Sequence, residues 1–133
     1  MGRLTVHLDR ASNLADTDVL GMTDPYVRFE LKQDNWTRDH DYGFQRSSVK
    51  KNEINPVYDE TFVFNNIPTL NNMVLKVKIL DDDIGSRDDK VGHCTIKLEE
   101  LGLTSTPMVV ERVVDRNMFR KNGRVHLKLS YDP

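Results

Sequence analysis

The sequence predicts an all-β protein, a single domain of residues 1–133 built as an eight-stranded antiparallel β-sandwich. Apolar residues alternate with polar ones at a period of two in several short runs, which is the pattern of half-buried strands. Gly, Pro, Asn and Asp stand between these runs, as they do in turns. No long segment shows helical spacing, and 133 residues are enough to bury the core of one domain.

The first half of the chain carries four of the alternating runs. In the first run Leu4, Val6 and Leu8 alternate with polar residues, and in the fourth Phe62 and Phe64 share one face. The third run is the weakest, and it follows a long polar loop. An Asn-Pro pair marks a turn just before the fourth run. The expected strands are residues 4–8, 26–31, 44–51 and 57–64.

The second half carries four more runs of the same kind. Val77 and Ile79 point inward from the fifth, and Val125, Leu127 and Leu129 from the eighth. The expected strands are residues 75–80, 93–98, 108–114 and 124–131, with a short helical turn at 99–103.

The composition excludes several classes of protein. The formal charge of -2 lacks the basic excess of a nucleic-acid binder. The single cysteine, Cys94, cannot form an internal disulfide. No apolar run approaches the roughly 18 residues of a membrane span, and the N-terminus lacks a signal-peptide pattern. We therefore expect a cytoplasmic monomer that does not bind nucleic acid, either a whole protein or one domain of a larger chain.

The sequence does not predict an enzyme. No Ser or Cys stands in a recognisable nucleophile turn beside a histidine base. The four histidines lack metal-ligand spacing, and those at outward strand positions are expected at the surface.

An acidic stretch follows the fifth expected strand directly. Residues 80–89 contain five aspartates, namely Asp81, Asp82, Asp83, Asp88 and Asp89. Two unit charges 4 Å apart repel by about 1 kcal/mol in water and about 4 kcal/mol near a protein surface. A folded loop with so many carboxylates is expected to bind a cation. Oxygen ligands without nearby His or Cys favour a hard ion, calcium before magnesium.

An acidic loop earlier in the chain should meet this stretch. The connection after the first strand contains Asp16, Asp18 and Asp24. If successive strands run antiparallel, the connections after strands one, three and five lie at the same end of the sandwich. The two acidic loops and the turn at 52–56 are therefore expected to converge into a cation site built from loops on a rigid scaffold.

Three segments resemble motifs of the C2 domain family. Residues 11–14 and 18–27 resemble its first calcium-binding loop, and residues 80–83 with 89–92 resemble the third. Residues 55–64, Asn-Pro-Val-Tyr-Asp-Glu-Thr-Phe-Val-Phe, are similar to the family's Asn-Pro-x-Trp-Asn-Glu-x-Phe-x-Phe strand, with Tyr58 for the usual Trp and Asp59 for the usual Asn. The first strand begins near Met1, so the arrangement resembles the type II topology, with both termini opposite the calcium loops.

The resemblance implies a set of ligands for two to three calcium ions. The family's five calcium aspartates fall on Asp18, Asp24, Asp81, Asp83 and Asp89. Its main-chain carbonyl ligands fall on Thr17 and Asp82. The alternative is that these aspartates form solvated turns, which is the ordinary role of a loop aspartate. Five of them at the family's spacing favour calcium.

The resemblance also implies that the loops dock on an anionic phospholipid membrane when calcium is bound. The apolar residues expected at the loop tips are Val19, Leu20, Met22 and Ile84. Full burial of such side chains contributes about 1.5–3 kcal/mol each. Arg87 could contact lipid phosphate. Alternatively, Leu20 or Met22 folds back over the loop base and Arg87 pairs with Asp88.

Two further interpretations remain open. Many C2 domains bind phosphoinositides on a basic concave face, and here Arg28, Arg46 and Lys50 mark that place. Glu30 and Ser48 stand where more basic residues would be expected, so a merely solvated face is the favoured interpretation. The alternative to membrane binding is a protein-interaction C2 domain in which calcium is mainly structural.

Overall fold

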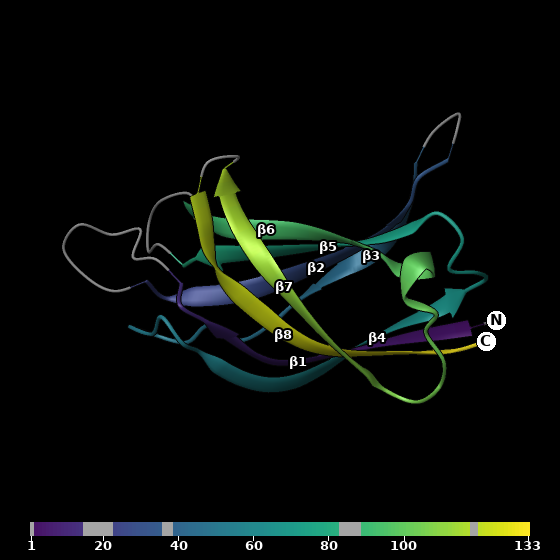
Figure 1. The fold of residues 1–133 in the computed structure, drawn as a ribbon, viewed down its shortest axis with the longest axis horizontal. Coiled ribbons are helices and arrows are strands. Elements are labelled where there is room, and N and C mark those ends of the chain that lie inside the picture. Colours follow the sequence, from purple (N-terminus) through teal and green to yellow (C-terminus); the bar gives the residue numbers. More distant parts are fainter. Residues whose placement is uncertain (1, 15–22, 36–38, 83–88, 118–119) are drawn as a thin grey trace.

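The structure is a computed structural model that describes residues 2–14, 23–35, 39–82, 89–117 and 120–133, and for residues 89, 116, 117 and 120–122 it describes the backbone alone (Figure 1). Its strands are β1 (Gly2–Ser12), β2 (Pro25–Gln33), β3 (His40–Arg46), β4 (Val57–Ile67), β5 (Met73–Asp81), β6 (Asp89–Lys97), β7 (Met108–Asn117) and β8 (Arg120–Asp132). A short 3-10 helix, η1 (Leu98–Leu101), follows β6. No helix in these ranges is long and apolar enough to cross a membrane.

The strands form two antiparallel layers. Their hydrogen-bonded order is β3-β2-β5-β6-β7-β8-β1-β4. Within the described residues a single pair, His93 and Asp115, connects β6 to β7, so the order divides there into two four-stranded sheets. The predicted eight-stranded antiparallel sandwich is confirmed.

The core lies between the two sheets and follows the alternation seen in the sequence. Leu4, Val6 and Leu8 of β1 are fully buried, and the polar residues between them face outward. The register of β1 against β8 shifts between Leu8 and Arg10, which marks a β-bulge. Because of this shift Ala11 points inward again and is fully buried, one position later than strict alternation would place it.

The third strand begins and ends earlier than predicted. β3 covers His40–Arg46 rather than residues 44–51. The chain still follows β2 beyond Arg46, since the amide of Ser47 donates to the carbonyl of Val27 at 2.8 Å. Regular pairing stops because Ser48 turns toward the other sheet, where its amide and hydroxyl both donate to the Glu60 carboxylate.

The connections after β1, β3 and β5 meet at one end of the sandwich, which we call the loop pole (Figure 1). The amide of Leu14 donates to the carbonyl of Ile54 at 3.0 Å, and the amide of Asp82 donates to the carbonyl of Asp24 at 3.0 Å. The predicted convergence is therefore confirmed. Both ends of the chain lie at the opposite pole, as predicted. The assignment to the type II permutation stays a prediction.

Candidate metal centre

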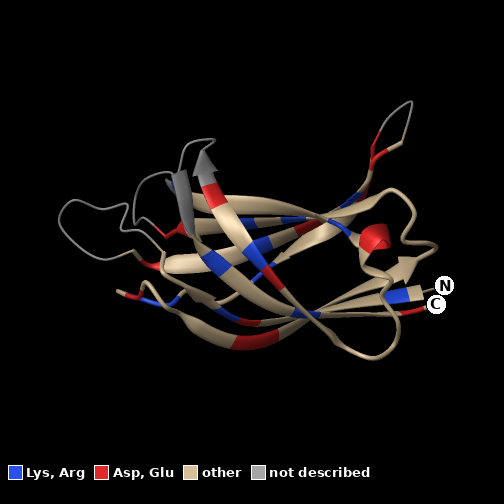
Figure 2. Cartoon of the chain, viewed as in Figure 1, with Lys and Arg blue, Asp and Glu red and all other residues tan. Residues whose placement is uncertain are grey.

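The predicted ligands and membrane contacts fall partly outside the described residues. Those outside are Thr17, Asp18, Val19, Leu20, Met22, Asp83, Ile84 and Arg87. Asp24, Asp81 and Asp82 are described, and so is the backbone of Asp89. Figure 2 shows acidic segments where the described chain enters the loop pole.

Asp81 ends the inward row of β5. Val77 and Ile79 of this row are fully buried in the core, and Asp81 is the next residue of the same parity. Its exposed fraction is only 3%, which is unusual for a carboxylate because burying an unpaired charge is costly. The position therefore requires hydrogen-bond donors or a cation to stabilise the charge.

Asp24 supplies one such donor and is itself held in place. Its amide donates to Oδ1 of Asp81 at 2.8 Å, and its own Oδ1 accepts the amide of Asn52 at 2.8 Å. The carbonyl of Asp24 accepts the amide of Asp82 at 3.0 Å. The two carboxylates are thus fixed by backbone groups, an arrangement that leaves little freedom for their remaining oxygens.

The strand register brings a third aspartate to the same place. Asp81 lies opposite Pro25 on β2 and opposite Asp89 on β6. The backbones of two aspartates are therefore cross-strand neighbours at the loop pole. The register of β5 against β6 also shifts beside this pair, between Ile79 and Leu80, and such irregularities are common next to functional sites.

The donor set suits a hard divalent cation. The side chains described at this place are carboxylates, and the expected partners Asp18 and Asp83 would add more oxygen. In the residues that the structure describes, no group of three or more His, Cys, Asp or Glu side chains is close enough to hold a metal ion. A complete cage would therefore need the residues outside the described ranges.

Tyr58 holds the backbone next to Asp24 in place, a role that sequence reasoning missed. Its hydroxyl donates to the carbonyl of Pro25, the residue after Asp24, at 2.6 Å. Burial raises the pKa of this hydroxyl above its ordinary value of 10.0. The replacement of the family's usual Trp by Tyr was the available signal, because a buried Tyr needs a partner for its hydroxyl.

The basic residues of the predicted phosphoinositide patch are only partly brought together. Arg28 and Arg46 lie opposite one another on β2 and β3. Arg28 stacks over the ring of Phe44, with 4.1 Å between the guanidinium carbon and the ring centre. Nζ of Lys50 lies 5.9 Å from the ring centre of Tyr58.

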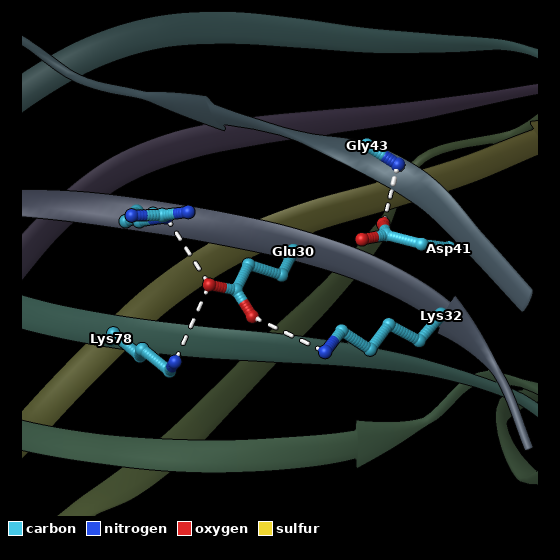
Figure 3. Close-up of polar contacts among 6 residues, drawn as sticks. Glu30, Lys32, Asp41, Gly43 and Lys78 are labelled. Carbon is cyan, nitrogen blue, oxygen red and sulfur yellow. Dashed lines mark hydrogen bonds and ion pairs between the residues drawn. The ribbon is translucent and has the colours of Figure 1, made fainter. Parts of the chain in front are cut away.

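Glu30 sits among the cations of this face (Figure 3). Its carboxylate lies 3.2 Å from Nε of Arg28, 3.3 Å from Nζ of Lys78 and 4.0 Å from Nζ of Lys32. The exposed fraction of Glu30 is 9%. A carboxylate in this position offsets much of the charge that would attract an anionic ligand.

Comparison with known proteins identifies relatives over most of the chain. The family described as C2 domain matches residues 2–113. Synaptotagmin-3 of Mus musculus is 34% identical over 96 residues, covering 71% of this chain and 16% of that protein. The 16 kDa phloem protein 2 of Arabidopsis thaliana is 34% identical over 134 residues, covering 99% of this chain and 82% of that protein. The chain thus spans about a sixth of the synaptotagmin and most of the phloem protein.

Solved structures show the same fold. A C2 domain of a plant extended synaptotagmin 1 has a TM-score of 0.85 at 22% identity, covering 99% of this chain and 95% of that chain. A calcium-bound pair of C2 domains from extended synaptotagmin 2 has a TM-score of 0.73 at 23% identity, covering 98% of this chain and 45% of that chain.

Proposed function

The chain belongs to the C2 domain family, and on this premise we propose that it is a calcium-dependent module that binds anionic phospholipid membranes. The observation that best supports the proposal is the hydrogen bond from the amide of Asp24 to the buried carboxylate of Asp81, at 2.8 Å. This bond joins two acidic loops that lie 57 residues apart in the sequence. A related structure described as calcium bound adds support at the level of the fold.

In this proposal the loop pole binds two to three calcium ions. The side-chain ligands are Asp18, Asp24, Asp81, Asp83 and Asp89, and the main-chain carbonyl ligands are those of Thr17 and Asp82. Asp24 and Asp81 are already oriented by backbone amides, so their cost of ordering on binding is small. Calcium, when bound, supplies positive charge and open coordination positions for lipid phosphate oxygens.

Membrane contact then has two parts. The loop face is negative without calcium and is repelled by an anionic membrane, and calcium binding removes this repulsion. The apolar side chains at the loop tips can then insert among the lipids. The proposed contact residues are Val19, Leu20, Met22, Ile84 and Arg87. Binding of this kind is peripheral and reversible, and it needs no catalytic group.

Sedimentation with vesicles of phosphatidylserine and phosphatidylcholine tests the proposal. The chain should sediment when calcium is present and remain in solution after chelation. The double variant Asp81→Asn with Asp83→Asn should lose this binding, because two carboxylate ligands become neutral amides. Asp132→Asn is the matched control: Asp132 pairs with Arg3 near the C-terminus, and this variant should bind as the unchanged chain does.

Two results would lead to other conclusions. Unchanged sedimentation of the double variant would contradict the proposed site. Calcium that raises the melting temperature without any vesicle binding would instead favour a protein-interaction domain in which calcium is structural.

We also propose that the concave face attracts phosphoinositides only weakly. Arg28 and Arg46, which lie opposite one another on β2 and β3, supply the positive charge there together with Lys50. We expect the attraction to be weak because Glu30 is ion-paired with Arg28 and Lys78 and offsets their positive charge.

A further inference from the structure

Residues 50–58 belong to the β3–β4 connection and the first two positions of β4. They are hydrogen bonded to both ends of the connection between β1 and β2, the first acidic loop in chain order. We call these residues the clamp segment. Its bonds to the returning end of the loop are Lys50 N to Pro25 O at 3.1 Å, Asn52 N to Asp24 Oδ1 at 2.8 Å, Glu53 N to Thr23 O at 3.0 Å, and Tyr58 hydroxyl to Pro25 O at 2.6 Å. One of these bonds is made to a carboxylate oxygen, and the others hold the backbone beside it.

The end of the loop that follows β1 is held by residues 54–56 of the clamp segment. The bonds are Ala11 N to Pro56 O at 3.0 Å, Asn13 N to Asn55 Oδ1 at 2.8 Å, and Leu14 N to Ile54 O at 3.0 Å. The described ends of the loop, Leu14 and Thr23, are therefore tied to the same short segment. The distance between them is set by the clamp segment as well as by the strands.

Two asparagines give the clamp segment its shape. Asn52 has a φ of 52°, in the left-handed region that Asn tolerates better than other side chains do. The amide of the same residue donates to Oδ1 of Asp24 at 2.8 Å. The side chain of Asn55 accepts the Asn13 amide, and the backbone amide of Asn55 donates to Oε1 of Glu53 at 2.9 Å.

A donor on one carboxylate oxygen fixes the direction of the other oxygen. Groups that orient metal ligands in this way, without touching the metal, commonly change its affinity about 10- to 100-fold when they are removed. We propose that the clamp segment sets the calcium affinity of the first loop, with Asn52 and Asn55 as positioning residues. The inference deepens the proposed function and rests on it.

A pair of substitutions at Asn52 tests the backbone part of the clamp segment by calorimetric titration of the full chain with calcium. Asn52→Gly keeps the left-handed conformation and the amide, so calcium affinity should stay within about threefold of the unchanged chain. Asn52→Val disfavours that conformation and displaces the amide, and affinity should fall about 10-fold or more. Asn72→Val is the matched control, because Asn72 has a φ of 61° at the opposite pole. It should lower the melting temperature of the calcium-free chain by a similar amount and leave calcium affinity unchanged.

A second pair tests the side chain of Asn55. Asn55→Leu removes the acceptor of the Asn13 amide and should weaken calcium binding about 10-fold. Asn55→Asp keeps an acceptor oxygen in the same place and should restore the affinity. If Asn55 had a purely structural role, Asn55→Leu would lower the melting temperature, but its calcium affinity would equal that of Asn55→Asp.

The results separate this inference from the function on which it rests. No calcium binding by the unchanged chain would overturn both. Calcium binding by the unchanged chain with equal affinity in Asn52→Val, Asn52→Gly and Asn55→Leu would overturn the clamp alone. Equal weakening by Asn72→Val and Asn52→Val would also overturn it, because the effect would then follow stability rather than position.

Discussion

Nδ1 of His126 on β8 lies 3.1 Å from Oε1 of Glu111 on the neighbouring strand β7. Nε2 of the same ring lies 3.0 Å from Oγ of Ser12, the last residue of β1. Both ring nitrogens are therefore used, and the residue is only 8% exposed. This histidine holds three strands together just before the chain enters the first acidic loop.

We predict that His126→Leu lowers the free energy of unfolding by about 1–2 kcal/mol, because the part-buried Ser12 hydroxyl loses its partner. Glu111→Gln should cost less than about 1 kcal/mol, since the Glu111 side chain is 49% exposed and regains water. Urea unfolding measures both. His40→Leu is the control: His40 is exposed, and its replacement should change stability by no more than about 0.5 kcal/mol. Equal costs for His126→Leu and His40→Leu would contradict the structural role.

The same histidine shows what the alternating pattern of the sequence can predict and what it cannot. Alternation with Val125 and Leu127 predicts that His126 faces outward, and it does. Outward does not mean exposed: the expectation that this histidine lies at the surface is wrong, because Glu111 of β7 and Ser12 of β1 lie against its two ring nitrogens. The local period determines direction, whereas burial depends on how strands far apart in sequence pack.

In the candidate site, too, part of the arrangement follows from the sequence pattern and part depends on contacts between distant segments. The order of the antiparallel strands predicted which loops converge, and the hydrogen bonds near Asp24 confirm it. The support from Asn52 could not be read from the sequence, because it depends on a backbone amide. For Tyr58 the replacement of Trp indicates only that its hydroxyl needs a partner, and the structure identifies that partner as the carbonyl of Pro25. The third strand was misplaced because polar contacts of Ser48, rather than its own pattern, end the regular pairing.

Substitutions of Asp81 should affect the stability of the calcium-free chain and its response to calcium differently. Asp81→Asn keeps a side-chain oxygen for the Asp24 amide and removes a buried negative charge, so the calcium-free chain should be at least as stable as before. Asp81→Leu leaves that amide without an acceptor and should cost about 1–3 kcal/mol. Neither variant should gain stability from calcium, whereas the unchanged chain should gain it in proportion to the logarithm of calcium concentration. Thermal unfolding with and without calcium is the measurement, and a calcium-dependent rise in the melting temperature of Asp81→Asn equal to that of the unchanged chain would exclude Asp81 as a ligand.

Tyr58→Phe should have an effect that depends on pH. Near pH 7 the loss of the hydrogen bond to Pro25 should cost about 0.5–1.5 kcal/mol. Burial raises the pKa of Tyr58 in the folded chain above its ordinary value of 10.0, so above that pH the unfolded chain releases this proton first and stability falls. The Phe variant lacks this contribution, and the gap in stability should shrink as the pH rises past about 10. Urea unfolding at about pH 7 and about pH 11 checks the sign, and a constant gap would show that Tyr58 ionises equally in both states.

Glu30→Gln should convert the concave face into a stronger anion-binding surface. Arg28, Arg46 and Lys78 lie in one transverse row, since Arg28 faces Arg46 on one side and Lys78 on the other. Glu30 is ion-paired with two of these cations, at 3.2 and 3.3 Å, and neutralising it frees about one positive charge. One such charge near an anionic membrane is worth about 1 kcal/mol, so binding to phosphoinositide vesicles in the presence of a chelator should tighten about fivefold. Glu100→Gln, at an exposed position of η1, is the matched control and should have no effect. The gain should shrink as salt is raised, because exposed charges are screened. Unchanged vesicle binding by Glu30→Gln would mean that the row of cations is only a solvated face.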